Sequence, residues 1–301
     1  MAPACRRRLP AHGRADAGLL RAAALLRAGP AGRLRQIELT VLSWNVRAGI
    51  GPGDFPAAWW RKVDRSRLDA VGSLVREVEA DVVALQEVTL ASIDGRAVDQ
   101  AAELGRLTGM EHRYGAVWSF PLVTPESGLA AGAALWGNAV LSRYPIVAAE
   151  THALPLVPDE DPAEPQDTEP RCVLVTRVEL PSGQLSFAST HLGWRGRRVR
   201  RAQAERLVEL ATDLPRPLIV AGDLNAAVED DELAPLASLG DAFAAAGIPA
   251  GDGRRQSCGL SRIDHVLVDG VQVLDCRVLR EAGDTSDHLP VLARVSLAEA
   301  G

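Results

Sequence analysis

An apolar run that ends abruptly in polar side chains is the feature that most constrains this chain. Residues 219–222 are followed by Asp223, Leu224 and Asn225. Alternate side chains of an extended chain point to the same side, so Asp223 and Asn225 would face one pocket if the strand persisted. A carboxylate there suits a hard cation and an amide suits an oxyanion, as a phosphate ester would require. An ordinary turn, which also favours Asp and Asn, is the alternative.

Polar residues occupy the ends of other expected strands as well. Any one of them alone is compatible with a cap, a turn or, for His191, a structural histidine. Strand ends on one rim of a sandwich converge, however, so the whole set predicts a common cleft. The set comprises Asn45, Glu87, His191, Asp223 with Asn225, Asp264 with His265, and Asp287 with His288.

Hydrophobic periodicity predicts many strands and few helices. Helices are expected over residues 64–79, 97–107, 195–210 and 229–239. Strands are expected over residues 37–46, 82–85, 114–118, 139–141, 146–153, 172–180, 185–191, 263–268, 271–279 and 289–295, with a hairpin turn at 181–183. Residues 36–297 contain no linker and no short-period repeat, which favours one domain built on packed sheets.

Composition narrows the class of protein. The 301 residues are 47% hydrophobic with a net charge of -6, so a general electrostatic nucleic-acid binder is disfavoured. An enzyme that binds a phosphate group through a metal ion is compatible with this negative net charge. The four cysteines, Cys5, Cys172, Cys258 and Cys276, are widely scattered. They predict neither a zinc cluster nor a disulfide framework, and they favour a reducing compartment.

The first 35 residues are rich in arginine and alanine and are expected to form a disordered extension. Arg21 and Arg27 interrupt its apolar part, which disfavours a secretory signal without excluding export. No stretch is long and apolar enough to span a bilayer. We therefore expect a soluble, cytoplasmic protein, and the oligomeric state stays open.

Seven short sequence words resemble the endonuclease/exonuclease/phosphatase superfamily and follow its order across residues 37–296. This family includes pancreatic-type DNases, abasic-site endonucleases, inositol polyphosphate phosphatases and neutral sphingomyelinases. The resemblance implies a DNase-I-like α/β (α+β) fold: a four-layered sandwich of two packed, mixed, mainly antiparallel sheets flanked by helices. The words are LSWNVRAG (42–49), DVVALQEV (81–88), GNAVLSRYPI (137–146), STHL (189–192), VAGDLN (220–225), RIDHVLV (262–268) and SDHLPV (286–291).

The resemblance also implies metal-dependent phosphoester hydrolysis and a set of metal ligands. Glu87 matches the family's metal-binding glutamate, Asn45 would help to hold the metal or its water, and Asp287 would share a metal. The implied cofactor is Mg²⁺, with Mn²⁺ as the alternative, because oxygen ligands suit such cations. The cation would polarise a phosphoryl oxygen and offset charge on the leaving oxygen. The number of metals is left open.

The remaining matched residues are implied to carry the chemistry. Asp264 and His288 match the family's Asp–His pair, in which the carboxylate orients the imidazole. Asp223 and Asn225 would hold the attacking water and a nonbridging oxygen, and His191 would stabilise charge at the phosphate. Either Asp223 or His288 could act as the base.

A basic stretch follows His191. Its arginines could rim the cleft and attract a phosphorylated substrate, with Arg195 and Arg197 as candidate binding residues, or they could form a solvated helix face. Trp194 could stack on a base, sit at a lipid surface or pack on its own helix. The stretch contains Arg195, Arg197, Arg198, Arg200 and Arg201.

These observations predict a metal-dependent phosphodiesterase of endonuclease or exonuclease type. The alternative is a phosphatase or phospholipase C-like hydrolase that acts on lipid head groups or inositol phosphates. Nucleic acid, phospholipid and inositol phosphate therefore all stay open as substrates. A noncatalytic binding module on the same fold would predict a broken site, whereas every matched position is intact.

Overall fold

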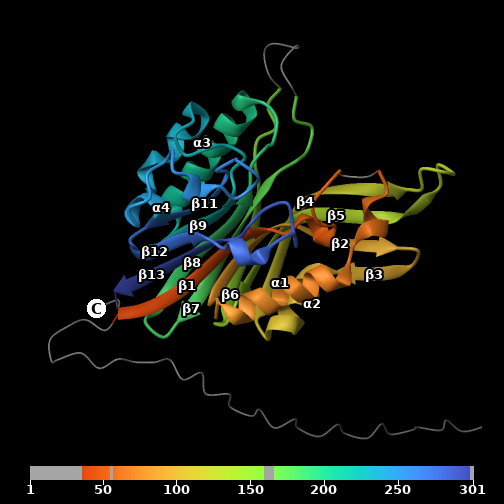
Figure 1. Ribbon diagram of the computed structural model, residues 1–301. Helices are drawn as coiled ribbons and strands as arrows, with labels where there is room; N and C mark the ends of the chain where they lie inside the picture. The colour runs from red at the N-terminus through yellow and green to blue at the C-terminus, as the bar shows by residue number, and fades with distance from the viewer. Residues whose placement is uncertain (1–35, 55–56, 159–165, 299–301) are drawn as a thin grey trace, which may run out of the picture. The chain divides into compact units, whose positions relative to one another are not determined.

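The computed structural model describes residues 36–54, 57–158 and 166–298. The predicted extension, residues 1–35, lies outside them. Two mixed sheets make up the described part (Figure 1), as the sequence predicted. The seven-stranded sheet has the order β12-β13-β1-β2-β5-β4 with β3 beside β2, and the six-stranded sheet has the order β10-β11-β9-β8-β7-β6.

The first sheet is formed by β1 (Gln36–Asn45), β2 (Val82–Ile93), β3 (Arg96–Asp99), β4 (Glu111–Val123), β5 (Ala130–Ser142), β12 (Gln272–Val278) and β13 (Val291–Ala298). The second is formed by β6 (Ile146–Ala153), β7 (Cys172–Leu180), β8 (Gly183–His191), β9 (Leu218–Asp223), β10 (Gly240–Asp241) and β11 (Asp264–Asp269). Among these described strands, β1–β2 and β8–β9 pair in parallel and the other pairs are antiparallel. The sheets are therefore mixed but mainly antiparallel.

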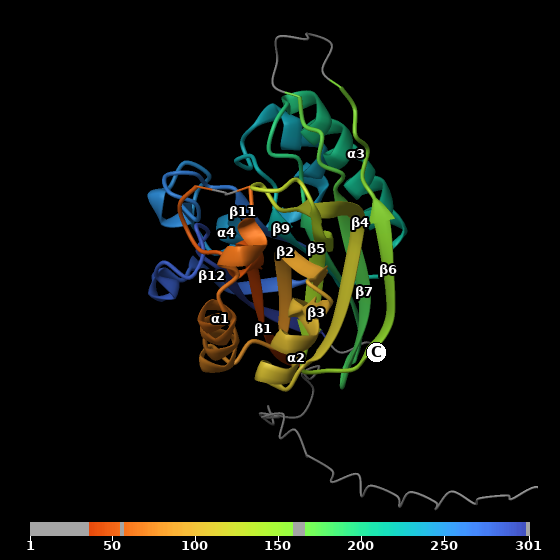
Figure 2. The ribbon, with the colours of Figure 1, turned by 90° about the vertical axis from the view of Figure 1, so that its right-hand side faces the viewer.

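Helices cover the outer face of each sheet (Figure 2). Helices α1 and α2 pack on the first sheet, whereas α3 and η3 pack on the second. The α-helices are α1 (Arg65–Glu77), α2 (Gln100–Thr108), α3 (Arg197–Asp213) and α4 (Ala242–Ala245). The 3-10 helices are η1 (Arg47–Gly49), η2 (Trp59–Lys62), η3 (Asp231–Ser238), η4 (Gly253–Arg255) and η5 (Arg280–Ala282).

Alternation along the strands produces the layers. On β9, Ile219 and Ala221 pack into the core between the sheets, while Leu218 and Val220 pack outward beneath α3 and η3. On β1, residues such as Val41 face the inter-sheet core, and Leu42 faces outward. The central strands thus carry apolar residues on both faces, and the four-layered sandwich predicted from the sequence is confirmed.

Helix α1 illustrates how local sequence sets an element. Leu68, Val71 and Val75 recur at helical spacing and are buried against the first sheet. The Asp64 side chain accepts a hydrogen bond from the Ser66 backbone N–H at 2.8 Å, which caps the first turn of the helix. The predicted helix over 64–79 therefore begins and ends within two residues of the observed bounds.

Other predicted elements differ from the structure. Strands β2, β4 and β5 are longer than predicted, because their far ends form an arm with its own core, where Trp59 and Trp60 pack against Leu122 and Trp136. The predicted helix at 229–239 is the 3-10 helix η3, which contains Pro235, a residue without a backbone N–H. No helix in the described residues is long and apolar enough to cross a membrane.

Candidate active site

Three predicted site residues lie side by side at one rim of the second sheet. His191 ends β8, Asp223 ends β9 and Asp264 begins β11. The strand register pairs His191 with Asp223, and Asp223 with Asp264. Each residue is separated by an even number of positions from the residues of its strand that face the core between the sheets. Since side chains alternate along a strand, all three side chains lie on that same face, just beyond the end of the apolar core.

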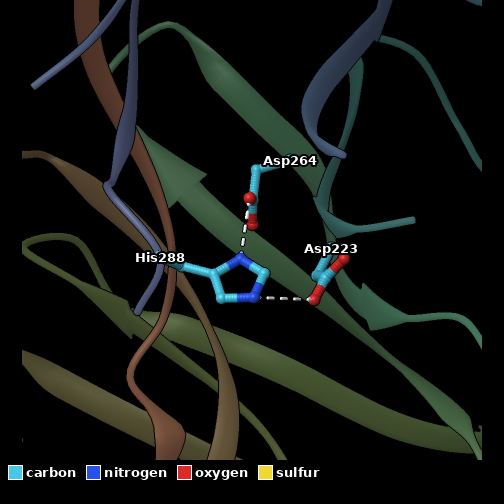
Figure 3. A group of neighbouring side chains, drawn as sticks. All are labelled: Asp223, Asp264 and His288. Atoms are coloured by element: carbon cyan, nitrogen blue, oxygen red, sulfur yellow. Dashed lines mark hydrogen bonds and ion pairs between the residues drawn. The ribbon is translucent and has the colours of Figure 1, made fainter. Parts of the chain in front are cut away.

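His288 joins this row from the segment before β13 (Figure 3). Its Nδ1 lies 2.8 Å from Asp264 Oδ2, and its Nε2 lies 3.7 Å from Asp223 Oδ2. The indole Nε1 of Trp44 donates to the His288 carbonyl oxygen at 2.9 Å, which fixes the backbone of this segment. A buried carboxylate, an imidazole and a second buried carboxylate therefore form a continuous chain.

The charges of this chain follow from burial and proximity. Burial alone would lower the pKa of His288, but the carboxylates of Asp264 and Asp223 raise it well above the usual value. Burial raises the pKa of Asp223 to about 7, although the nearby His288 opposes the shift. At neutral pH the imidazole is hence cationic, and Asp223 is a stronger proton acceptor than an ordinary aspartate.

A backbone irregularity turns Glu87 into the same cleft. The β2–β5 register shifts between Leu85 and Val88, and Glu87 has a positive φ of 55°. Regular alternation would direct Glu87 outward, since its neighbour Gln86 faces inward and donates to Ser189 Oγ at 3.2 Å. The bulge re-aims the carboxylate instead, so that its Oε1 accepts a hydrogen bond from Asn45 Nδ2 at 2.9 Å.

Asn45 connects the two sheets at the rim. Its Nδ2 donates to Glu87 on the first sheet and, at 3.1 Å, to Asp223 Oδ2 on the second. Its Oδ1 accepts from the Arg47 backbone N–H at 3.0 Å. Asn45 is buried and holds both carboxylates at a fixed separation.

The donor set around Glu87 fits a hard divalent cation. Burial raises the pKa of Glu87, and the negative charge of Asp287 adds to this shift. Apart from the bond to Asn45, no described side chain donates to Glu87. Asp287 pairs with Arg47 Nε at 3.2 Å and is about one-third exposed. Carboxylate and amide oxygens are the ligands that Mg²⁺ and Mn²⁺ favour.

Asp223, Asp264 and His288 also offer three ligand atoms within 4.8 Å of one another. The hydrogen bond between Asp264 and His288 already occupies two of these donors, however. In the other group, the Asn45 oxygen and Asp287 are also engaged, by the Arg47 backbone N–H and guanidinium, but Glu87 Oε2 accepts no hydrogen bond from a described side chain. Glu87 therefore leaves the clearest ligand capacity for a cation.

His191 and Asn225 form the other side of the cleft. Asn225 Nδ2 lies 3.0 Å from His191 Nε2 and donates to the Leu192 carbonyl oxygen at 3.0 Å. Burial, together with the positive charge of Arg171, lowers the pKa of His191 well below its usual value. His191 is consequently neutral, in contrast to His288.

Asn225 reaches the cleft by a route that differs from the predicted one. Strand β9 ends at Asp223, and Asn225 has a φ of 52°, so strand alternation does not place it. A turn does so, in which the Asn225 backbone N–H donates to Asp223 Oδ1 at 2.9 Å. The sequence left open whether Asp223 and Asn225 form a turn or share a pocket, and in the structure they do both.

Arg171 was missed by the sequence analysis. Its guanidinium lies 3.1 Å from His191 Nδ1 and 2.6 Å from Glu169 Oε2, and its side chain is only 5% exposed. Arg171 immediately precedes β7 but belongs to none of the family words, so only the strand start could have indicated it. Arg47 was also missed, although it lies inside LSWNVRAG.

The predicted basic stretch is largely neutralised. Arg197 and Arg200 share the carboxylate of Glu232, at 3.1 and 2.9 Å, and Arg201 pairs with Glu205 at 3.1 Å. Arg195 instead stacks on Trp194. The structure therefore separates the two candidate binding residues, Arg195 and Arg197.

This combination of two packed mixed sheets and a polar rim defines the DNase-I-like class of phosphoesterase folds. The chain belongs to the endonuclease/exonuclease/phosphatase family, whose model matches residues 42–288. Members of this family generally hydrolyse phosphoester bonds and typically depend on divalent metals. A search of curated protein sequences returned no significant match.

Several solved structures share the fold. An endonuclease/exonuclease/phosphatase from Beutenbergia cavernae is 24% identical with a TM-score of 0.63, over 87% of this chain and 72% of that one. The Bacteroides thetaiotaomicron mannosyl-6-phosphatase Bt3783 is 22% identical with a TM-score of 0.57, over 85% and 99%. D. rerio TDP2, complexed with a single-strand DNA product, is 18% identical with a TM-score of 0.59, over 86% and 98%.

Proposed function

We propose that this chain is a Mg²⁺- or Mn²⁺-dependent phosphoester hydrolase, and specifically a phosphodiesterase of endonuclease or exonuclease type. One observation carries the proposal: Asp264, His288 and Asp223, joined by a hydrogen bond and an ion pair, meet the Asn45–Glu87 pair at a single rim. A noncatalytic module on this fold would have no need for two buried carboxylates around one cationic imidazole, since such an arrangement is costly to bury.

The residues of the rim suit nucleophilic attack by water on phosphorus. Asp223, with its pKa raised to about 7, accepts the proton of the attacking water. The P–O bond to the leaving alkoxide breaks as the new P–O bond forms, and solvent supplies the proton that the alkoxide takes up. His288, kept cationic by Asp264, donates a hydrogen bond to a nonbridging oxygen.

Two further groups position the phosphate. Neutral His191 and the Asn225 amide lie beside Asp223, where they can hydrogen-bond the second nonbridging oxygen. Glu87, with Asn45 and Asp287, would hold a divalent cation, which supplies charge neutralisation at a phosphoryl oxygen and at the leaving group.

A phosphatase or phospholipase C-like activity is the second candidate, and Arg171 favours it. This guanidinium is almost fully buried, and its Nε has no hydrogen-bond partner among the described residues. A buried cation with a spare donor suits the additional charge of a phosphomonoester.

A substrate panel tests the proposal. Purified protein with Mg²⁺ or Mn²⁺ is assayed on bis(p-nitrophenyl) phosphate, plasmid DNA, an abasic oligonucleotide, sphingomyelin and inositol phosphates. We expect diester hydrolysis that chelator abolishes. Exclusive hydrolysis of monoesters or lipids would establish the second candidate, and metal-independent activity would contradict both.

A further inference from the structure

A half-exposed tryptophan stands just beyond the candidate active site. Trp194 lies in the loop between β8 and α3, three residues after His191, and is 48% exposed. The guanidinium carbon of Arg195 lies 3.8 Å from the centre of its ring. The other tryptophans of the chain are buried or half-buried, so the exposure of Trp194 is unusual for this protein.

The loop that carries Trp194 is held firmly. The Gly193 backbone N–H donates to Gln203 Oε1 at 2.7 Å, and the Gly193 carbonyl oxygen accepts from Arg200 at 3.3 Å. The Arg195 backbone N–H donates to Asp167 Oδ2 at 3.4 Å. Bonds on both sides of Trp194 thus fix the backbone, and the ring is half exposed to solvent.

Arg195 differs from its neighbouring arginines in charge compensation. Arg197 and Arg200 are paired with Glu232, whereas no carboxylate of the described residues pairs with Arg195. Its positive charge is therefore available to a ligand. An aromatic ring covered by an uncompensated guanidinium is the combination that stacks on bases and accompanies a phosphate backbone.

We propose that Trp194 and Arg195 form a stacking platform for a nucleobase of single-stranded nucleic acid, next to the phosphate bound at the rim. The proposal rests on the proposed phosphodiesterase function and names its substrate class. Three residues of chain span at most about 11 Å, so Trp194 lies within about two nucleotides of His191. The amide of Asn225 binds the Leu192 carbonyl oxygen, which ties the platform directly to the site.

A lipid surface fits this region less well. Membrane contact requires a cluster of apolar side chains, but five of the seven residues after Trp194 are arginines. Of the exposed aliphatic residues, Val117, Val123 and Leu129 lie on the β4–β5 arm, and Leu156 is a single such residue in the segment that Gln203 joins to the Trp194 loop. Trp194 is thus a single aromatic ring among arginines, which suits a planar polar ligand better than acyl chains.

The test measures binding without turnover. A fluorescein-labelled oligothymidylate and an abasic oligomer of the same length are titrated with the full chain in chelator, and affinity is read from anisotropy. We expect Trp194→Ala to weaken oligothymidylate binding about tenfold and leave abasic binding unchanged, since stacking requires a base. Trp194→Phe should recover most of the loss. Arg206→Ala, the matched control, removes an arginine further along α3 that is paired with Glu209 and should change the affinity by less than twofold.

Three results would overturn the platform: no oligothymidylate binding by the wild type, equal losses on both oligomers in Trp194→Ala, or Trp194-dependent binding to phosphatidylserine vesicles in its place. Hydrolysis of bis(p-nitrophenyl) phosphate is measured in parallel. If that activity persists while the platform fails, only the substrate class is wrong. If it is absent as well, the proposed function fails.

Discussion

The two sheets contribute to the rim in different ways. On the second sheet, His191, Asp223 and Asp264 stand at regular positions of three paired strands. On the first sheet, Glu87 depends on a bulge and a positive φ, and Arg47, two residues after Asn45, also has a positive φ. The proton-handling groups thus rest on backbone register, whereas the proposed cation ligand rests on a strained backbone that its surroundings must stabilise.

The largest loss of activity is expected for a substitution on the second sheet, whose site residues stand at regular strand positions. Asp223→Asn keeps the shape but removes the proposed proton acceptor, so kcat on bis(p-nitrophenyl) phosphate should fall about 10³-fold. Thermal unfolding should show that the variant is folded. Asp269→Asn, at the other end of β11, is the matched control and should retain activity. An Asp223→Asn variant within tenfold of the wild type would remove Asp223 from the chemistry.

On the irregular side, Glu87→Gln should act through metal affinity. The amide retains one oxygen but loses the charge that a divalent cation requires, so activity at limiting Mg²⁺ should fall about 10²-fold and recover partly at high Mg²⁺. Calorimetric Mg²⁺ titration provides a readout besides activity. Glu126→Gln, an exposed carboxylate paired with Arg61, is the control. An unchanged Mg²⁺ dependence would place the metal elsewhere.

Arg171 allows a test of the contrast between the two histidines. Arg171→Met should raise the pKa of His191 towards its usual value, because one of the three causes that lower it is removed, while burial and the charge of His288 remain. NMR titration of the imidazole reports this shift, and kcat/KM should fall roughly 10- to 100-fold. Arg171→Lys should restore the low pKa more fully than the activity, since lysine cannot reproduce the guanidinium fork. A His191 pKa that does not respond would refute the electrostatic coupling.

The pH profile is a test that needs no substitution in the wild type. The proposed base must be ionised, and the pKa of Asp223 is raised to about 7, so kcat should increase with pH up to about 7 and fall about tenfold per unit below it. The raised pKa of His288 predicts a second, alkaline limb where the imidazole loses its proton. In Asp223→Asn the acid limb should vanish from the residual activity. An acid limb that survives this substitution would assign the base to another group.

The same contrast explains what the sequence could predict. Strands with continuous patterns, such as β6 and β7, were predicted with their observed bounds, and the strand-end residues Asp223 and His191 were found from the ends of apolar runs. The Glu87 bulge contains no glycine to signal a positive φ, so its geometry could not be predicted from local sequence.

Long-range pairing sets a further limit. Arg171 is isolated in sequence from His191, and its role emerges only when β7 and β8 form their hairpin. Likewise, the arginines of α3 look available in sequence, and only the fold brings Glu232 against Arg197 and Arg200. The sequence pattern of a segment predicts which of its side chains are buried. It does not predict which charged residues of another segment will lie next to it in the fold.

The pairing of β8, β9 and β11 also fixes the distances between the site residues that these strands carry. Adjacent paired strands lie about 4.8 Å apart whatever side chains they carry, because backbone hydrogen bonds set that spacing. The backbone spacing between His191, Asp223 and Asp264 therefore does not depend on which side chains surround them. Structures that share this fold at 18–24% identity can therefore differ in most of their side chains while the spacing between paired strands stays the same. Variation is then free to accumulate in the connecting loops, including the one that carries Trp194.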